Sequence, residues 1–132
     1  MDDEGTVIHR VIDAWLDAVS RRDIDGLIGL YSEDAQFWGT MGARLCHGRS
    51  EIRDYFSRFL DRYRMRADLL DLHWQRSGDR VLAAGAYRFT WQDQPDREEV
   101  DARARFTFVL GPTDAGWRIF QHHSSAWVVG GL

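Results

Sequence analysis

Two strand-like segments near the end of the chain carry polar side chains on faces that also carry aromatic rings. Successive residues of a strand point to opposite faces, so Arg103 and Arg105 share one side of the first segment. In the second segment, strict alternation puts Gln121 and His123 on a common side. Charged and titratable groups on an otherwise buried face cost free energy unless they are paired or used. The spacing therefore predicts a pocket marked by Arg105 and His123.

The chemistry of these groups favours a small anionic or carbonyl-bearing organic ligand. The planar guanidinium of arginine can hold a carboxylate through two parallel hydrogen bonds. A histidine imidazole, with an intrinsic pKa of about 6.5, exchanges protons near neutral pH, which makes His123 the candidate catalytic residue. The expected reaction type is cofactor-free acid–base chemistry such as isomerisation, cyclisation or dehydration. The expected ligand-binding set is Arg103, Arg105 and Gln121, with aromatic walls from Trp15, Trp38, Tyr87 and Trp91.

A second interpretation of the same residues needs no ligand. Arg105 is then neutralised by an internal acid such as Glu98, Glu99 or Asp101, and His123 is a core histidine whose hydrogen bonds are satisfied. Perturbed polar groups also occur in structural networks, so the residue types alone leave both interpretations open.

The opposite face of the two segments carries Phe106, Phe108, Phe120 and His122. A large apolar face is costly to leave in water, so this face predicts a homodimer formed through the sheet. Adjacent strand residues diverge, so His122 and His123 are not expected to hold one metal ion. No metal and no cofactor is expected.

Composition excludes several other classes of protein. The chain has 132 residues, which suits a single domain spanning residues 1–132, and a formal net charge of -4. All 17 basic residues are arginine and none forms a basic block, so no nucleic-acid partner is expected. Cys46 is the only cysteine, which excludes an internal disulfide. An acidic start without a leader pattern, and no apolar run of about 20 residues, predict a cytoplasmic protein with no membrane partner.

Periodicity predicts the elements that position these groups. Apolar residues at helical spacing predict a helix over 8–19, a short helix from 24 to 31 capped by Asp23, and a third helix over 52–63 capped by Ser50. The aromatic stripe of the third helix is assigned to the core, with a ligand wall as the alternative, and consists of Tyr55, Phe56, Phe59 and Tyr63. Strands are expected over 35–38, 70–74, 83–91, 103–110 and 117–125.

This order of elements predicts an α+β domain, in which three N-terminal helices pack inside a curved antiparallel sheet. The region from 39 to 48, rich in glycine, is expected to be a loop. Cys46 within it is expected to be a packing thiol rather than a nucleophile.

Four short motifs carry a resemblance to a known superfamily. They are Arg22-Asp-Ile-Asp-Gly-Leu27, Tyr31-Ser-Glu-Asp-Ala-Gln-Phe37, Gly48-Arg-Ser-Glu-Ile52, and Trp117 followed by His122-His123-Ser124-Ser125. In this order the chain resembles the nuclear transport factor 2-like superfamily, whose cone-shaped sheet wraps a helix and leaves a pocket at its open end. The ending resembles the association domain of calcium/calmodulin-dependent kinase II and its bacterial relatives, grouped with the SnoaL-like proteins.

The resemblance implies positions as well as a fold. In the association domains, the residues aligned with Arg105 and His123 are a pocket arginine and a histidine of the last strand, and the domains assemble through the sheet. A non-catalytic association domain is therefore the alternative function. The ketosteroid isomerase branch uses a tyrosine on the first helix and an aspartate on the first strand, where this chain has Trp15 and Gly39. The resemblance therefore does not extend to that catalytic mechanism.

Overall fold

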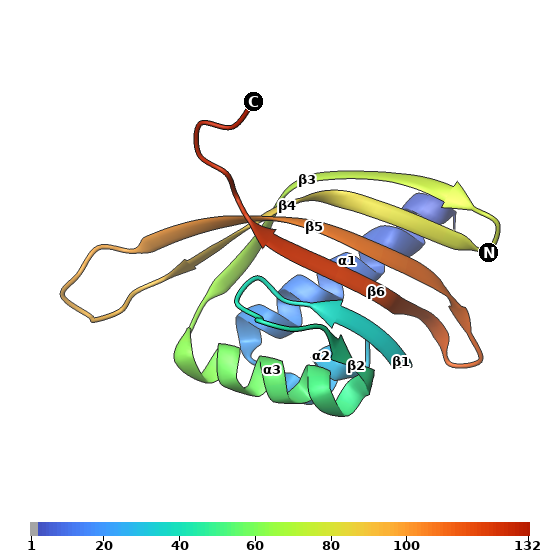
Figure 1. The fold of residues 1–132 in the computed structure, drawn as a ribbon, viewed down its shortest axis with the longest axis horizontal. Coiled ribbons are helices and arrows are strands. Elements are labelled where there is room, and N and C mark those ends of the chain that lie inside the picture. Colours follow the sequence, from blue (N-terminus) through green and yellow to red (C-terminus); the bar gives the residue numbers. More distant parts are fainter. Residues whose placement is uncertain (1–2) are drawn as a thin grey trace.

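The computed structural model describes residues 3–132 and contains three helices and six strands (Figure 1). Met1 and Asp2, part of the acidic start used above, lie outside the described residues. The helices are α1 (Glu4–Arg21), α2 (Ile24–Ile28) and α3 (Gly48–Arg62). The strands are β1 (Tyr31–Trp38), β2 (Cys46–His47), β3 (Arg66–Ser77), β4 (Arg80–Trp91), β5 (Val100–Thr113) and β6 (Gly116–Ala126).

Local hydrogen bonds at the ends of α1 and α2 fix the first part of the chain. The carboxylate of Asp3 accepts from the amide of Thr6 and begins α1, and Arg22 ends it in the left-handed conformation with φ 57°. Asp23 then accepts from the amide of Gly26 at 3.0 Å, which confirms the predicted cap of α2. The chain turns into β1 already at Tyr31, three residues after α2 ends.

The start of α3 differs from the prediction. The helix begins at Gly48, and its cap residue His47 makes no capping hydrogen bond through its side chain. The carboxylate of Glu51 instead accepts from the backbone amide of His47 at 3.0 Å. The helix therefore begins about one turn earlier than predicted, and Ser50 lies inside it. The predicted cap at Ser50 is therefore wrong.

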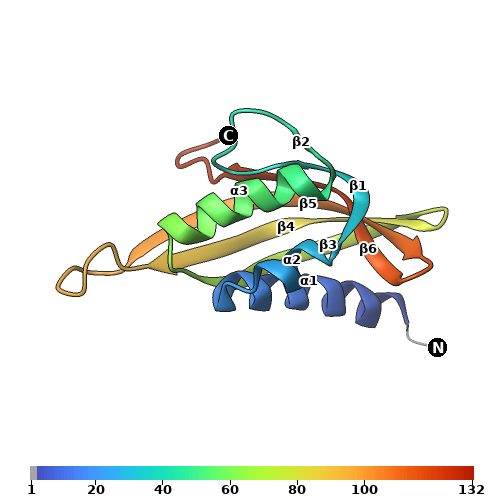
Figure 2. The ribbon, with the colours of Figure 1, turned by 90° about the horizontal axis from the view of Figure 1, so that it is seen from below.

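The strands form one sheet in the order β2-β1-β6-β5-β4-β3. Strands β3 to β6 run antiparallel in chain order, as the sequence predicts, while β1 lies parallel to β6 at the other side of the sheet. The sheet curves over α1, and α3 lies along β1 and β2 (Figures 1 and 2). The hairpin between β4 and β5 projects beyond the helices in both views. This arrangement confirms the predicted α+β fold, with a sheet that is mixed rather than wholly antiparallel.

The concave side of the sheet is filled by aromatic residues around Trp15 of α1. The Trp15 ring stacks on Tyr87 at 5.1 Å between centroids and meets Phe56 and Phe108 edge-on. All four side chains are buried. Rings of this size contribute about 150–250 Å² of buried area each, so this cluster dominates the stability of the domain.

A β-bulge in β6 decides which side chains face the core. Val109 pairs with Gln121 but Leu110 pairs with Ile119, so Phe120 is an extra residue without a partner on β5. One inserted residue shifts the alternation by one and moves later side chains to the other face. His122 and Ser124 are consequently buried and His123 is exposed.

Candidate functional site

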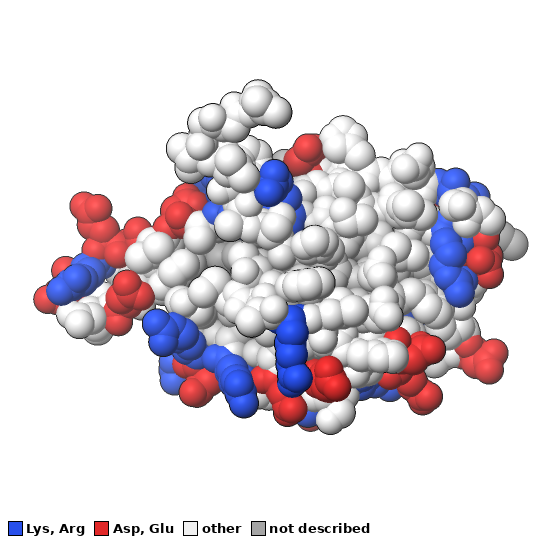
Figure 3. All heavy atoms as spheres, in the orientation of Figure 1, with Lys and Arg blue, Asp and Glu red and all other residues white. Residues whose placement is uncertain are grey.

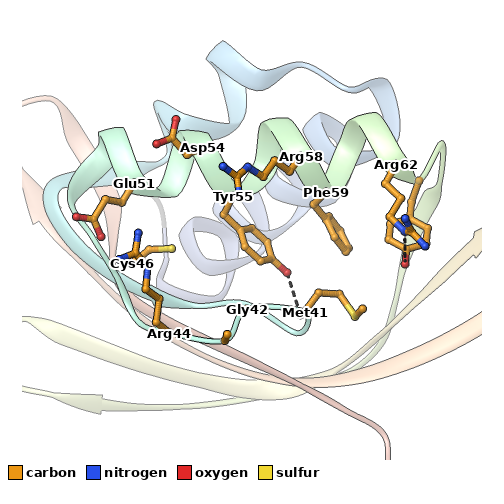
Figure 4. A pocket seen from close by; sticks show the side chains of 12 residues that line it. Met41, Gly42, Arg44, Cys46, Glu51, Asp54, Tyr55, Arg58, Phe59 and Arg62 are labelled. Carbon is orange, nitrogen blue, oxygen red and sulfur yellow. Dashed lines mark hydrogen bonds between the residues drawn. The ribbon is translucent and has the colours of Figure 1, made fainter.

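A cleft of about 560 Å³ opens between α3 and the loop that joins β1 to β2 (Figure 4). The α3 side is supplied by residues spaced three or four apart, which places them on one helical face: Glu51, Asp54, Tyr55, Arg58, Phe59 and Arg62. The opposite side is supplied by Met41, Gly42, Ala43, Arg44 and Cys46. A volume of this size is typical of small-ligand pockets.

Half-buried aromatic rings make the apolar wall of the cleft. Tyr55 and Phe59 stack with centroids 5.5 Å apart and planes 20° apart, and Phe59 lies 5.5 Å from Tyr63. Tyr63 in turn packs against Trp91 of β4 at 5.0 Å. The prediction that the aromatic stripe of α3 lies in the core therefore holds only for Phe56, which is buried. Tyr55, Phe59 and Tyr63 line the cleft instead.

The loop facing α3 is tied down at several points. The hydroxyl of Tyr55 accepts from the amide of Met41 at 3.1 Å, and the indole of Trp38 donates to the carbonyl of Gly42 at 3.1 Å. A Cβ atom at Gly39 would overlap the Tyr55 ring, so glycine allows the close contact there. The loop side of the cleft is therefore held in a fixed position by hydrogen bonds to α3 and β1.

A hydrogen-bonded network of polar side chains lies in the interior behind this wall. The indole of Trp15 donates to the Tyr31 hydroxyl at 3.0 Å, and that hydroxyl lies 2.8 Å from Nδ1 of His122. Nε2 of His122 lies 3.2 Å from the Tyr87 hydroxyl, which donates to Ser124 at 2.6 Å. Ser124 also contacts the hydroxyl of Thr40, in the loop that forms the cleft. The network thus joins the core to that loop.

The direction of donation follows from the groups themselves. An indole nitrogen can only donate, so Tyr31 accepts from Trp15 and has its own proton left for Nδ1 of His122. Nε2 then carries the imidazole proton and donates to Tyr87, whose proton goes to Ser124. Every buried donor from Trp15 to Tyr87 finds an acceptor in this arrangement, as buried polar groups require.

Burial controls the ionisation of the network and of the cleft hydroxyl. Desolvation, followed by the nearby His123, holds the pKa of His122 well below its ordinary value, so this imidazole is neutral at physiological pH. Desolvation also raises the pKa values of Tyr31 and Tyr87. In the cleft, desolvation raises the pKa of Tyr55 to about 12. All three tyrosines therefore remain protonated hydrogen-bonding groups.

Cys46 is buried at one end of the cleft. Desolvation and then the charge of Glu51 raise the pKa of its thiol, which opposes formation of a thiolate nucleophile. Across residues 3–132, no group of three or more His, Cys, Asp or Glu side chains is arranged to hold a metal ion.

The structure does not bring the predicted pocket residues together. Arg105 and His123 are exposed on the outer face of the sheet, so the prediction that they line an internal hollow is wrong. Gln121 is exposed as well and donates to Gln36 at 3.0 Å. Arg103 lies at a separate surface hollow beside Trp127. The prediction placed the polar side chains of β5 and β6 on the interior face of the sheet. The apolar side chains of these strands occupy that face instead, because burying apolar groups lowers the free energy of the folded state more than burying polar groups.

The expected aromatic walls lie in three different places. Trp15 and Tyr87 are in the filled interior, and Trp91 packs at the end of the cleft wall against Tyr63. Trp38 is 43% exposed and stacks near His123 on the outer face, with centroids 6.3 Å apart. These rings do not enclose one pocket.

The predicted dimer face is also largely wrong. Phe106, Phe108 and His122 point into the core, and each is at most 3% exposed. Phe120 alone of the four is half-buried, and the guanidinium of Arg80 lies 4.1 Å from its ring. Strict alternation along β6 overlooks the bulge at Phe120, which separates this ring from His122, and no glycine lies at the bulge.

Two sets of polar residues that the structure brings together were not predicted from the sequence. The cleft residues Arg58 and Arg62 flank the aromatic stripe of α3, and their helical spacing was available as a signal. His122 and its tyrosine partners are separated by up to 91 positions, so no local pattern joins them.

A half-open α+β cone with a cleft beside its third helix defines the class of protein. The family profile of the SnoaL-like domain matches residues 8–129. The chain therefore belongs to the SnoaL-like family. Within residues 3–132, none of the helices combines the length and the apolar character needed to cross a membrane.

Solved structures share this fold over nearly the whole chain. A candidate calcium/calmodulin-dependent protein kinase II association domain from Xanthomonas campestris is 28% identical, with a TM-score of 0.83, and the match covers 96% of this chain and 89% of that one. A candidate dehydratase of the NTF2-like family from Streptomyces avermitilis is 18% identical, with a TM-score of 0.83 and coverage of 94% and 96%.

A ketosteroid isomerase-like protein from Erwinia carotovora is 21% identical, with a TM-score of 0.78 and coverage of 98% and 100%. At these identities the dehydratase and isomerase-like structures establish the common fold alone. A search of curated proteins gives no significant match.

Proposed function

We propose that this protein binds a small organic molecule in the cleft between α3 and the loop from β1 to β2. The observation that carries the proposal is the cleft itself, about 560 Å³ in volume, with stacked rings on one wall and several charged groups around it. Ligand pockets typically combine an apolar wall with a few oriented polar groups. The interior around Trp15 is filled by buried aromatic side chains, including Phe56 and Tyr87.

The bound molecule is proposed to undergo cofactor-free acid–base chemistry. The cleft residues that can accept a proton are the carboxylates Glu51 and Asp54, and the protonated hydroxyl of Tyr55 can supply a hydrogen bond. Isomerisation or dehydration would use such groups without a bound cofactor. Two structures of the same fold, a candidate dehydratase and a ketosteroid isomerase-like protein, support this type of reaction.

Binding is tested with 2-naphthol, a neutral ring compound that fits the cleft, by following backbone amide signals in NMR spectra. We expect shifts at residues 41–46 and 55–63, and their loss when Ala43→Trp fills the cleft from the loop side. The matched control is Ala84→Trp, at an exposed position of β4 away from the cleft. Shifts that lie elsewhere, or that survive Ala43→Trp unchanged, would contradict binding in this cleft.

Acid–base activity has a separate test. The exchange of α-hydrogens of 1-tetralone in D₂O requires only a proton acceptor beside a bound ketone. We expect the protein to accelerate exchange, and Asp54→Asn or Glu51→Gln to reduce the acceleration at least about tenfold. Exchange at the same rate with and without protein would remove the enzymatic part of the proposal and leave the binding part standing.

A second candidate function is a non-catalytic association domain. It is supported by the 28% identity to the candidate kinase association domain from Xanthomonas campestris. The molecular mass of the protein in solution, measured by light scattering, distinguishes the association domain from the ligand-binding protein. A hexamer or larger ring favours the association domain, and a monomer or dimer favours the ligand-binding proposal.

A further inference from the structure

We propose that the ligand of this cleft is a flat ring compound with one carboxylate, bound with its ring against Tyr55 and Phe59 and its carboxylate at Arg58 and Arg62. This inference rests on the proposed binding function and names its ligand class. In the cleft, Arg62 lies toward the C-terminal end of α3, and the Arg58 side chain is directed back along the helix toward Tyr55 and Asp54 (Figure 4).

Arg58 and Arg62 are one helical turn apart and both line the cleft. Within residues 3–132, neither has a carboxylate within ion-pair distance. Arg53 of the same helix differs, because it pairs with Asp25 at 2.9 Å. In a protein with an excess of acids, two arginines without an ion pair at one cleft form a site ready for an anion.

The guanidinium of Arg62 is held beside the aromatic wall. Its Nε donates to the Tyr63 hydroxyl at 3.1 Å, and its central carbon lies 5.5 Å from the centre of the Tyr63 ring. The terminal nitrogens remain available as donors, in the planar geometry that suits a carboxylate. Arg62 is therefore partly pre-oriented, which reduces the entropy lost on binding.

The aromatic wall next to these arginines selects a flat partner. The Tyr55 and Phe59 rings stack on each other with planes only 20° apart, so a flat ring placed on an open face of either one extends the same stack. Aromatic pairs in offset or edge-on contact gain about 0.5–1.5 kcal/mol beyond the area that they bury. A ligand without a flat apolar part would leave this wall in water.

The charges of the cleft also set the direction of the ligand. Glu51 and Asp54 lie toward the N-terminal end of α3, seven and four residues before Arg58, which corresponds to roughly 10 Å and 6 Å along the helix. Arg44, from the loop, stands near Glu51 and offsets part of that charge (Figure 4). A carboxylate is thus attracted by Arg58 and Arg62 and repelled by Glu51 and Asp54, which favours one anionic group over two.

The helix dipole opposes this arrangement but is weaker. The C-terminal end of a helix carries a partial charge of about -0.5, which disfavours an anion nearby. Two full positive charges at the cleft outweigh it. Basic and acidic side chains alternate along the edge of the molecule that α3 forms (Figure 3).

The test compares 2-naphthoate with 2-naphthol, which share a ring system and differ in charge. We expect 2-naphthoate to bind about tenfold more tightly to the unaltered protein at low salt, and added salt to reduce the difference. Arg58→Gln and Arg62→Gln should each weaken 2-naphthoate about five- to tenfold and change 2-naphthol less than about twofold. Arg53→Gln, on the same helix but paired with Asp25, is the matched control and should change neither.

The possible outcomes separate this inference from the proposed function. Equal affinity for the two compounds, or 2-naphthoate binding that is insensitive to both arginine variants, would overturn the carboxylate class while 2-naphthol binding still supports the cleft. Failure of both compounds to bind would remove the binding function, and the ligand class with it.

Discussion

The interior of the sheet and the cleft beside α3 both contain tyrosines and ionisable groups, but they use them in opposite ways. In the interior, Tyr31, Tyr87 and His122 satisfy one another at 2.8 and 3.2 Å and are fully buried. In the cleft, Tyr55 is half-buried and Arg58 has no ion pair within the described part of the chain. The interior network is closed by its own partners, whereas the cleft has groups left for a ligand.

His122 and His123 present the same contrast at adjacent positions. One imidazole is 1% exposed, neutral and bonded through both nitrogens, while the other is exposed to water. A histidine fixed by two hydroxyls stabilises the fold and is poorly placed to exchange protons with a ligand. Chemical reactivity in this protein is therefore expected where groups remain unsatisfied, and the following predictions test that difference.

The largest expected effect is the loss of the buried imidazole. His122→Ala should lower the free energy of unfolding by about 3–5 kcal/mol, because it leaves a cavity, removes the acceptor for the Tyr31 hydroxyl proton and removes the donor to the Tyr87 hydroxyl. Urea unfolding measures the change. His123→Ala is the control and should stay within about 0.5 kcal/mol of the unaltered protein. Similar losses for the two variants would show that burial does not separate these histidines.

Removing one hydroxyl should give a smaller effect of the same kind. Tyr87→Phe deprives Nε2 of His122 of its acceptor and Ser124 of its donor, at a cost of about 1–3 kcal/mol. Tyr55→Phe removes a hydroxyl that accepts from Met41 near the surface, where water can replace it, so the loss should be below about 1 kcal/mol. The comparison fails if Tyr55→Phe is the more destabilising change.

Lowering the pH should destabilise the folded protein through the buried His122. The pKa of His122 is lower in the folded protein than in the unfolded chain, where it is near 6.5, so the unfolded chain binds more protons just below that pH. Stability therefore falls as the pH drops below about 6.5, by up to about 1.4 kcal/mol per pH unit from this group.

Unfolding measured at pH 7.5, 6.5 and 5.5 tests this pH dependence, with His122→Phe expected to flatten the curve. If that variant does not fold, NMR of the imidazole carbons gives a second measurement. The His122 signals should stay constant over this range. Titration of His122 near pH 6.5 in the folded protein would contradict its neutral, enclosed state.

The smallest effect is expected on the outer face of the sheet. Arg105→Gln and His123→Gln should change 2-naphthoate affinity less than about twofold, because both side chains lie outside the cleft. Isothermal titration checks this against Arg58→Gln under the same conditions. A greater loss with Arg105→Gln would return the ligand site to the outer face.

Local interactions made much of this fold predictable. The stripe of Ile8, Val11, Ile12 and Trp15 predicts α1 because residues three and four apart share a helical face, and the structure buries all four. Asp23 predicts the start of α2 for the same local reason, since its carboxylate reaches an amide three residues later. Hairpin turns likewise predict the antiparallel order of β3 to β6.

The candidate site was predictable only in part. The helical spacing of Tyr55, Phe59 and Tyr63 was recognised, but a helix stripe alone does not show which rings meet the core and which meet a loop. The cleft depends on the loop after β1, which Tyr55 and Trp38 tie in place through hydrogen bonds to Met41 and Gly42. Such contacts between separate elements leave no periodic signal.

The amino-acid sequence thus determined the three helices, the capped start of α2, the antiparallel strands β3 to β6 and the family, because each depends on residues near one another or on their order. Tertiary structure decided the orientation of β6, where the unpaired Phe120 moves His122 inward and His123 outward. It also decided where a ligand can bind, since the cleft exists only when α3 and the loop after β1 meet. The physical reason is that a side chain's environment depends on which distant surface covers it, and that surface is created by folding.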